Sequence, residues 1–314
     1  MAFAVSPDQI LRVSAPDLVR DLDLLDDELW KLVDFTADLK RMPRRYAQAL
    51  EGKSIALLFE KPSLRTRMTF ELAAKQLGGD AVTAEGPIGA REPVKDVARN
   101  LDRWVSAIVA RTFAQETLEE LARWSSVPVI NALSDLYHPC QALADVFTLT
   151  EVFGELRGRK LAFIGDSNNV AHSLMLTATR LGMDFAIATP PGYEPNQEIV
   201  ETADRIAQST GATPTLTHNP EEAVRDADAV YTDVWASMGQ ETEAAQRRKA
   251  FARYQVNEAL MALARPDAVF LHCLPAKRGE EVTEAVIESP QSRVFDQAEN
   301  RLHVQKALLL MMVG

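Results

Sequence analysis

Cysteine is scarce in this sequence. Two cysteines, Cys140 and Cys273, occur among 314 residues, which is too few for a disulfide framework. Proteins of reducing compartments keep their thiols free. The chain also does not open with the basic and then apolar segments of a secretory signal. We therefore expect a cytoplasmic protein.

Long apolar runs and an excess of basic residues are also missing. No run reaches the length that a transmembrane helix needs. The 34 lysines and arginines are outnumbered by 45 aspartates and glutamates, so the formal net charge is −11. A field of this sign repels nucleic acids and anionic membranes. We therefore expect neither as a partner, and any bound anion needs a local basic pocket.

The glycine-rich loop of dinucleotide-binding enzymes is the third missing feature. The stretch 163–169 follows an apolar run, which makes a Rossmann oxidoreductase the competing enzyme class. Its G-x-G-x-x-G fingerprint is absent, because Ser167 and Val170 stand where the second and third glycines belong. The sequence therefore argues against a dinucleotide cofactor.

Apolar runs alternate with amphipathic helical patterns along the whole chain. The runs predict strands at 54–59, 105–110, 127–132, 160–165, 184–189, 229–234 and 267–273. Such alternation is typical of parallel sheets with helices on both faces. A helical pattern at 138–153 and a basic, turn-like stretch at 154–160 mark a domain change. We predict an α/β fold with two doubly wound domains.

The segment 59–67 combines hydroxyls and guanidiniums at the start of a predicted helix. It follows an apolar run and brings Ser63, Arg65, Thr66 and Arg67 to the first helical turn. Unpaired backbone N–H groups and the positive end of the helix dipole favour an anion there. The alternative is a serine N-cap followed by solvated arginines. Position after a strand favours a phosphate site.

Further polar segments follow other predicted strands, where ligands of doubly wound sheets bind. They are Arg111, His138-Pro-Cys-Gln141, Asn168-Asn169, Asp233-Val-Trp-Ala-Ser-Met-Gly239, His272-Cys-Leu-Pro275, and Glu299-Asn-Arg301 at the predicted start of the last helix. Six such segments predict a cleft at the sheet edge.

Each of these residues also has a purely structural interpretation. His138 could satisfy backbone groups at a helix start, one asparagine of 168–169 could cap a helix, and Asp233 could be a turn residue. A methionine such as Met238 often fills gaps, and a cysteine such as Cys273 is often a buried, inert thiol. No single motif therefore identifies the chemistry.

Histidine and cysteine side chains also raise the question of a zinc site. The candidates are His138, Cys140, His272 and Cys273. The adjacent pair His272 and Cys273 has no usual ligand spacing, and strand alternation is expected to point the two side chains to opposite faces. We expect no metal.

Taken together and in this order, S-x-R-T-R, H-P-C-Q, D-x-W-x-S-M-G, H-C-L-P and E-N-R resemble the motifs of the aspartate/ornithine carbamoyltransferase family. The D-x-W-x-S-M-G and H-C-L-P pair is similar to the members that use ornithine. The resemblance implies a carbamoyl phosphate domain at 1–137, an ornithine domain at 154–290, and a last helix, 298–314, that returns to the first domain. It also implies a homotrimer with no metal or organic cofactor.

The resemblance implies a carbamoyl phosphate site assembled from several motifs. The phosphate would be bound by Ser63, Leu64, Arg65, Thr66, Arg111 and Arg301, where planar guanidiniums suit its geometry. The carbamoyl group would be bound by His138, Gln141 and the backbone carbonyls of Cys273 and Leu274. Arg111 and His138 would polarise the carbonyl oxygen and stabilise the charge that develops when an amine attacks.

The resemblance also implies an ornithine site. Asn169, Ser237 and Met238 would bind the α-carboxylate and α-amine, and Asp233 would balance the positive charge. Cys273 would orient the reacting amine or relay its proton. The expected catalytic residues are Arg111, His138, Asp233 and Cys273. Covalent catalysis is not expected, because an amine can attack the activated carbonyl directly.

Two positions depart from the family pattern. Leu64 stands where threonine is usual, and Pro87 stands where glutamine is frequent. Leucine at the position of Leu64 also occurs in relatives that use acetylornithine. Acetylornithine, succinylornithine and putrescine therefore remain alternative acceptors, and a non-catalytic anion-binding protein remains the alternative to an enzyme.

Overall fold

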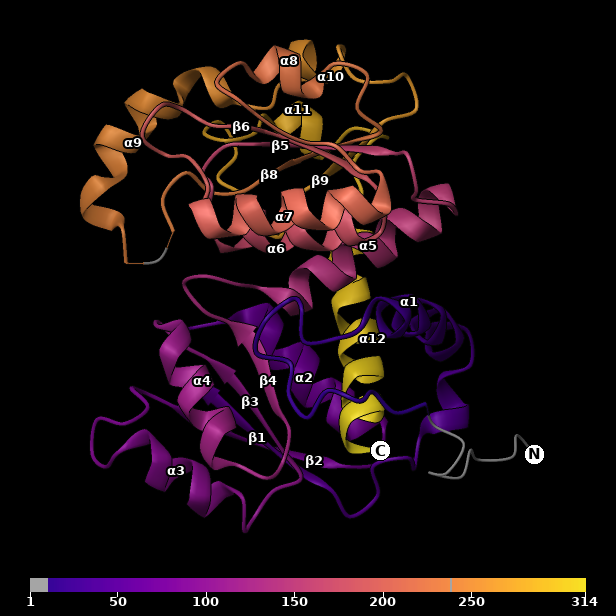
Figure 1. The fold of residues 1–314 in the computed structure, drawn as a ribbon, viewed down its shortest axis with the longest axis vertical. Coiled ribbons are helices and arrows are strands. Elements are labelled where there is room, and N and C mark those ends of the chain that lie inside the picture. The colour runs from indigo at the N-terminus through magenta and orange to yellow at the C-terminus, as the bar shows by residue number, and fades with distance from the viewer. Residues whose placement is uncertain (1–10, 238) are drawn as a thin grey trace. The chain divides into compact units, whose positions relative to one another are not determined.

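The computed structural model describes residues 11–237 and 239–314 (Figure 1). The chain divides into two compact units. The first contains the described residues up to Phe147 together with Glu299–Gly314, and the second contains Thr148–Ala298. The two boundaries fall inside helices α5 (Pro139–Phe153) and α12 (Val294–Val313). The chain therefore passes from one unit to the other within helices.

The first unit is built on a four-stranded parallel sheet. Its strands, in spatial order, are β2 (Asp80–Glu85), β1 (Ser54–Phe59), β3 (Ala107–Arg111) and β4 (Val129–Leu133). Its other elements are α1 (Asp26–Arg41), η2 (Pro43–Tyr46), α2 (Leu64–Gln76), α3 (Val94–Leu101) and α4 (Gln115–Trp124). Figure 1 shows α3 and α4 on one face of the sheet, and α2 and α12 on the other.

The second unit contains a five-stranded parallel sheet. In spatial order its strands are β7 (Pro214–Thr217), β6 (Asp184–Ala188), β5 (Lys160–Ile164), β8 (Ala229–Thr232) and β9 (Val269–Leu271). Its helices are α6 (Asn169–Arg180), α7 (Gln197–Thr210), α8 (Pro220–Val224), η3 (Glu241–Glu243), α9 (Ala244–Phe251), η4 (Ala252–Tyr254), α10 (Glu258–Met261) and α11 (Glu284–Ile287). Figure 1 shows α6 and α7 below this sheet and α8, α10 and α11 above it.

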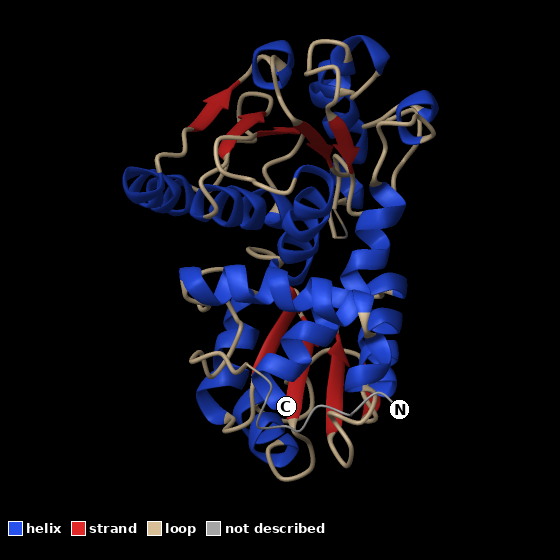
Figure 2. Cartoon of the chain, turned by 90° about the vertical axis from the view of Figure 1, so that its right-hand side faces the viewer, coloured by secondary structure: helices blue, strands red, loops and turns tan. Residues whose placement is uncertain are grey.

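The predicted α/β fold is confirmed, because each sheet is parallel and lies between helices (Figure 2). Helices on both faces remove the central strands from water. All residues of β3 and β4 are buried, as are all residues of β8. Strands that are buried on both faces have near-continuous apolar sequences. For this reason the apolar runs of the sequence predicted them.

Two strands were missed by the sequence pattern. Both β2 and β7 lie at sheet edges, and most of their residues are exposed or only partly buried. An edge strand has one backbone side without a neighbour and carries fewer apolar residues. Its strand state comes from pairing with β1 or β6, which no local pattern encodes. The predicted strand 267–273 is also too long, since β9 covers only Val269–Leu271.

The last helix begins earlier than predicted. It starts at Val294, with Asp296 in its first turn, so Glu299-Asn-Arg301 lies inside α12 and does not open it. An acidic residue in the first turn is a usual helix-start signal. No helix within the described part of the chain is long and apolar enough to cross a membrane.

Candidate active site

The S-x-R-T-R segment follows β1 and opens α2 in the first unit. Ser63 is the N-cap of α2, and its Oγ accepts from the Thr66 backbone N–H at 3.3 Å. The capping interpretation is therefore correct for Ser63. Capping leaves the other N–H groups of the first turn available for an anion. Leu64, the position that departs from the family pattern, has a side chain exposed to 67%.

The two arginines of this segment have different environments. Arg67 is paired with Glu85 and lies 3.8 Å from Glu71. Arg65 makes no ion pair within residues 11–237 and 239–314. The charge of Arg67 is therefore balanced by two partly exposed carboxylates, whereas among the described residues no carboxylate pairs with the guanidinium of Arg65.

Arg301 connects three of the predicted motifs. It is buried in α12, and its Nη1 donates to Oε1 of Gln141 at 2.5 Å while its Nη2 donates to Oγ1 of Thr66 at 2.7 Å. Gln141 in turn donates to Oδ1 of Asp145 at 2.7 Å. Asp145 thereby orients the amide so that its oxygen faces Arg301. A carbonyl oxygen has two lone pairs, so Gln141 can accept a second hydrogen bond from a ligand.

His138 is a buried, neutral imidazole at the start of α5. Burial lowers its pKa well below 6.5, and the guanidiniums of Arg301 and Arg111 lower it further. Arg111 ends β3 and is itself 7% exposed. A neutral imidazole has one N–H donor and one acceptor. His138 can therefore donate to a carbonyl oxygen without adding a third positive charge.

Lys61 is a basic residue of this region that the motif analysis missed. It is 8% exposed, and both burial and the nearby charge of Arg111 lower its pKa. Its Nζ lies 4.5 Å from the centroid of the Phe113 ring. A buried lysine is rare unless it is paired. The sequence feature that could have identified Lys61 is its position just after the end of β1.

In the second unit, Asp233 is the centre of a hydrogen-bonded group after β8. Its Oδ1 accepts from the Cys273 thiol at 3.0 Å, and its Oδ2 accepts from Nδ2 of Asn168 at 2.7 Å. Asp233 and Cys273 were both predicted as site residues. The structure brings these two predicted residues into contact.

The sequence suggested that one of Asn168 and Asn169 could cap a helix, and the structure shows that Asn168 is the N-cap of α6. Its Oδ1 accepts from the N–H groups of Val170 and Ala171 at 3.0 and 3.2 Å. The same side chain also orients Asp233, a role that the sequence did not predict. Asn169, the predicted ligand, is the first residue of α6. One asparagine thus uses both ends of its amide, and its neighbour occupies the helix start.

The D-x-W-x-S-M-G loop is attached to the unit by Arg247 of α9. Arg247 donates to Oδ2 of Asp166 at 2.9 Å and to the Trp235 carbonyl at 3.0 Å. Burial raises the pKa of Asp166 to about 6. The Ser237 backbone N–H donates to Oε1 of Gln240 at 3.0 Å, and Met238 lies outside the described residues. The loop therefore has a buried anchor that the motif analysis did not include.

The expectation that His272 and Cys273 point to opposite faces is wrong. Because β9 ends at Leu271, strand alternation no longer applies, and Leu274 has a positive φ of 57°. Ligand atoms of Asp233, His272 and Cys273 lie within 4.8 Å of one another. However, Nδ1 of His272 accepts from the Leu274 N–H at 2.9 Å and Nε2 lies 3.2 Å from Oε1 of Glu281. Both ring nitrogens are thus engaged, and a metal would have to displace one bond.

The two cysteines differ in environment. Cys140 is fully buried, and burial raises the pKa of its thiol to about 12. Its Sγ donates to the Asn131 carbonyl at 3.3 Å. Cys273 is only partly buried and contacts the carboxylate of Asp233. Of the two thiols, only that of Cys273 is partly exposed and bonded to another predicted site residue.

Comparison with known proteins agrees with this arrangement. Residues 17–151 match the family model of the aspartate/ornithine carbamoyltransferase carbamoyl-P binding domain, and residues 157–312 match that of the Asp/Orn binding domain. The chain belongs to the aspartate/ornithine carbamoyltransferase family. In this carbamoyltransferase family member the S-x-R-T-R and H-P-C-Q segments lie within the first match, and Asp233, Cys273 and Arg301 lie within the second.

Relatives of this family member match it over nearly their whole length. An ornithine carbamoyltransferase of Anoxybacillus flavithermus is 51% identical over 306 residues, which are 96% of this chain and 97% of the relative. An anabolic ornithine carbamoyltransferase of Pyrococcus furiosus is 48% identical over 311 residues, 97% of this chain and 98% of the relative. The solved structure of ornithine carbamoyltransferase from Pyrococcus furiosus superposes with a TM-score of 0.94 at 47% identity, covering 97% of this chain and 99% of that one.

Proposed function

We propose that this protein transfers the carbamoyl group of carbamoyl phosphate to the δ-amine of L-ornithine, giving L-citrulline and phosphate. The observation that carries the proposal is Arg301, which contacts Thr66 and Gln141 in the same buried group of side chains. A guanidinium beside a hydroxyl and an oriented amide matches a phosphate joined to a planar carbamoyl group. Family membership supports the same chemistry.

Carbamoyl phosphate binds to the first unit in this proposal. Arg65, Arg111 and Arg301 supply guanidiniums for the dianionic phosphate, and Ser63 and Thr66 supply hydroxyls and the helix start. Charge-assisted, forked hydrogen bonds to phosphate are stronger than neutral ones. Both Arg111 and Arg301 are at least nine-tenths buried, and an interaction of a buried cation with phosphate is weakly screened by water.

His138 and Arg111 activate the carbamoyl carbon. Attack by an amine moves negative charge to the carbonyl oxygen, and donors aimed at that oxygen stabilise the transition state. The depressed pKa of His138 keeps it neutral, so it donates a hydrogen bond and retains its proton. Gln141 accepts from the carbamoyl NH₂ through the oxygen that Asp145 has oriented.

Ornithine binds to the second unit in this proposal. Asp233 supplies the negative charge that a cationic amino acid needs, and Asn169 and Ser237 bind its α-carboxylate and α-amine. The neutral δ-amine attacks the carbamoyl carbon, a C–N bond forms, and the C–O bond to phosphate breaks. The amine loses one proton, which Asp233 or the departing phosphate accepts. Cys273 orients the amine through its contact with Asp233.

A homotrimer is part of the same proposal. Leu64, Met68 and Leu72 recur every four residues on α2, and their side chains are 67%, 47% and 40% exposed. Residues at this spacing share one helix face, and Val82 of the neighbouring strand β2 is 63% exposed. We assign this apolar stripe to contact with a second copy. Light scattering should give a trimer for wild type and a smaller mass for Met68→Lys, but not for Leu216→Lys on exposed β7.

We also propose a cytoplasmic location. Both cysteines are free, which suits a reducing compartment.

Acceptor preference is the direct test of the function. Citrulline formation should be measured with ornithine, acetylornithine, succinylornithine, putrescine and aspartate at a fixed concentration of carbamoyl phosphate. Ornithine should give the highest kcat/KM, because a closed polar site penalises a substrate that leaves its groups unpaired. A tenfold preference for putrescine or an acylated ornithine would overturn the acceptor assignment.

A further inference from the structure

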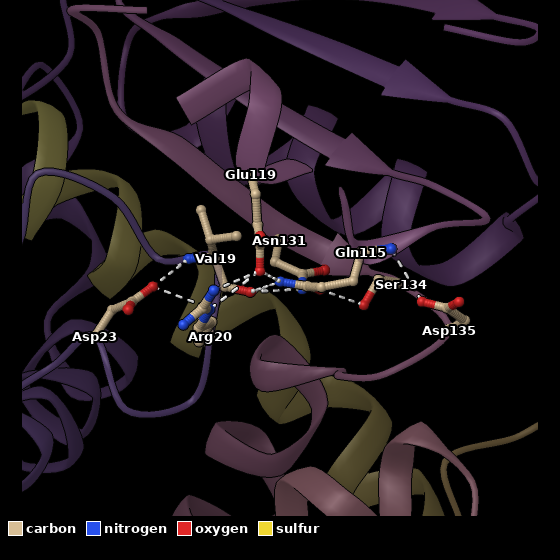
Figure 3. Close-up of polar contacts among 8 residues, drawn as sticks. All are labelled: Val19, Arg20, Asp23, Gln115, Glu119, Asn131, Ser134 and Asp135. Carbon is tan, nitrogen blue, oxygen red and sulfur yellow. Dashed lines mark hydrogen bonds and ion pairs between the residues drawn. The ribbon is translucent and has the colours of Figure 1, made fainter. Parts of the chain in front are cut away.

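Two loops of the first unit carry Arg111 and His138, and one side chain connects them. Arg111 ends β3, and Gln115 opens α4 four residues later. Ser134 follows β4 and precedes His138 by four residues. Gln115 is 5% exposed and Ser134 is fully buried. In Figure 3 the side chain of Gln115 reaches from α4 to Ser134 on one side and toward Asn131 and Val19 on the other.

The hydroxyl of Ser134 fixes the turn that leads to His138. It donates to Oε1 of Gln115 at 2.6 Å and accepts from the N–H groups of Tyr137 and Leu136 at 3.0 and 3.3 Å. The Ser134 N–H also donates to the Tyr137 carbonyl at 2.9 Å. A hydroxyl has one proton to donate, and of its two acceptors the Gln115 oxygen at 2.6 Å is much nearer than the Tyr137 carbonyl at 3.4 Å. The turn therefore has a defined conformation relative to Gln115.

Gln115 is held at both ends of its amide and at its backbone. Its Oε1 accepts from Ser134 and from Nδ2 of Asn131 at 3.4 Å, while its Nε2 donates to the Val19 carbonyl at 3.3 Å. Its backbone N–H donates to Oδ1 of Asp135 at 3.0 Å (Figure 3). The amide can therefore not flip without losing bonds in two directions.

The Val19 segment is in turn fixed by its own contacts. Oδ2 of Asp23 accepts from the N–H groups of Val19 and Arg20, each at 2.7 Å. Arg20 donates to Oε1 of Glu119 at 2.7 Å. Glu119 lies on α4, the helix that Gln115 opens. The hydrogen bonds that run from Gln115 through the Val19–Arg20 segment to Glu119 thus begin and end on α4.

The two loops are also joined through their backbones. The Thr112 N–H donates to the Leu133 carbonyl at 2.9 Å, and the Asp135 N–H donates to the Phe113 carbonyl at 3.1 Å. Gln115 and Ser134 add the side-chain bond between the same loops. The segment that follows Arg111 and the turn that precedes His138 are therefore joined by both backbone and side-chain hydrogen bonds.

We propose that Gln115 and Ser134 are positioning residues that hold His138 at the spacing from Arg111 required to polarise the carbamoyl oxygen. The proposal rests on the proposed function, since it assigns a role within that reaction. Small displacements of a group that contacts the reacting atoms reduce rate strongly. Of the phosphate ligands, Ser63, Arg65 and Thr66 lie at the start of α2, and Arg111 lies in β3, where pairing with β1 and β4 holds its backbone. Phosphate binding should therefore depend on this network much less than the position of His138 does.

The test distinguishes an effect on the residues that contact the carbamoyl group from an effect on the residues that bind the phosphate. Ser134→Ala removes the bond to Gln115 and both acceptor bonds of the turn. Steady-state citrulline formation should show at least a tenfold loss of kcat, while the affinity for inorganic phosphate, measured by calorimetry, stays within twofold of wild type. Thr36→Ala is the matched control, because Thr36 carries a fully buried hydroxyl of the same unit that donates within its own helix α1, to the Leu32 carbonyl at 2.7 Å. It should leave both quantities unchanged.

A second variant keeps the test decisive if Ser134→Ala does not fold. Gln115→Met keeps side-chain length and leaves the turn's own bonds intact, and it should show the same split between kcat and phosphate affinity. If both residues act through one bond, the double variant should lose no more kcat than the worse single variant. Wild-type kcat in either folded variant, an additive double variant, or an equal loss in Thr36→Ala would overturn the proposal. Absence of citrulline formation by wild type would instead overturn the proposed function, and this inference with it.

Discussion

The thiol of Cys273 donates a hydrogen bond to Oδ1 of Asp233 at 3.0 Å. Asn168 occupies the other oxygen of the same carboxylate. Asp233 is 7% exposed, so these two donors replace much of its hydration. The carboxylate therefore has a defined orientation before a cationic substrate arrives, and this relationship leads to the first two predictions.

Cys273 should contribute more to the orientation of the reacting amine than to the folding stability of the protein. Cys273→Ser keeps a donor for Asp233 and should retain part of the activity, whereas Cys273→Ala removes it and should lower kcat further. The affinity for carbamoyl phosphate should stay the same in both. Kinetics with ornithine as the varied substrate, together with denaturation midpoints, make the comparison. Wild-type kinetics in Cys273→Ala, together with a lowered denaturation midpoint, would show that Cys273 is an inert buried thiol.

Asn168 should have two separable roles. Asn168→Ser keeps an N-cap hydroxyl for α6 but is too short to reach Asp233, so stability should remain close to wild type while kcat/KM for ornithine falls. Asn168→Ala loses both roles and should also lose about 1 kcal/mol of folding free energy. Urea denaturation and ornithine kinetics on the same preparations test this. Equal ornithine kinetics in wild type and Asn168→Ser would show that the bond to Asp233 has no catalytic consequence.

Arg301 should be essential for phosphate binding, and its geometry should matter as much as its charge. Arg301→Ala should weaken binding of inorganic phosphate by about 2 kcal/mol or more, roughly 30-fold. Arg301→Lys should recover little, because an ammonium cannot contact Thr66 and Gln141 together in a fork. Calorimetry measures both affinities. The matched control is Arg67→Lys on exposed α2, where the ion pairs with Glu71 and Glu85 are solvated and little should change.

His138 should make the ligand-free protein acid-sensitive. Its folded pKa lies well below 6.5, so below that pH the unfolded state binds more protons than the folded state. Stability from this group is fully present above pH 6.5 and is lost as pH falls, with a limiting slope of about 1.4 kcal/mol per pH unit. The free energy of unfolding should be measured from pH 7.5 to 5 for wild type and His138→Gln.

The difference between these two proteins isolates His138 from other titrating groups. Burial also lowers the pKa of His303 and raises that of Asp166 to about 6. Asp166 acts in the opposite direction, because its stabilising contribution is lost as pH rises from about 4 to 6. The contributions of His303 and Asp166 are the same in wild type and His138→Gln, so they cancel in the difference between the two curves. Parallel pH curves would show that folding does not lower the pKa of His138.

Local chemistry explains which parts of the fold and site were predictable. Capping by Ser63, and by one of Asn168 and Asn169, could be considered from the sequence because a cap bonds to N–H groups only two or three residues away. The central strands were recognised because helices cover both of their faces. The edge strands β2 and β7 were missed, since their strand state depends on pairing with β1 and β6.

The sequence by itself determined the α/β class, the helix caps, and the motifs that resemble a carbamoyltransferase. The tertiary structure alone decided which side chains meet. Arg301 contacts residues 160 and 235 positions away, and Asn168 contacts Asp233 across 65 positions. It also decided that Asn168 and not Asn169 orients that carboxylate, and that Gln115 connects the loops of Arg111 and His138. The physical reason is that hydrogen-bond partners of buried groups come from distant segments, and only the packing of helices on the sheets brings those segments together.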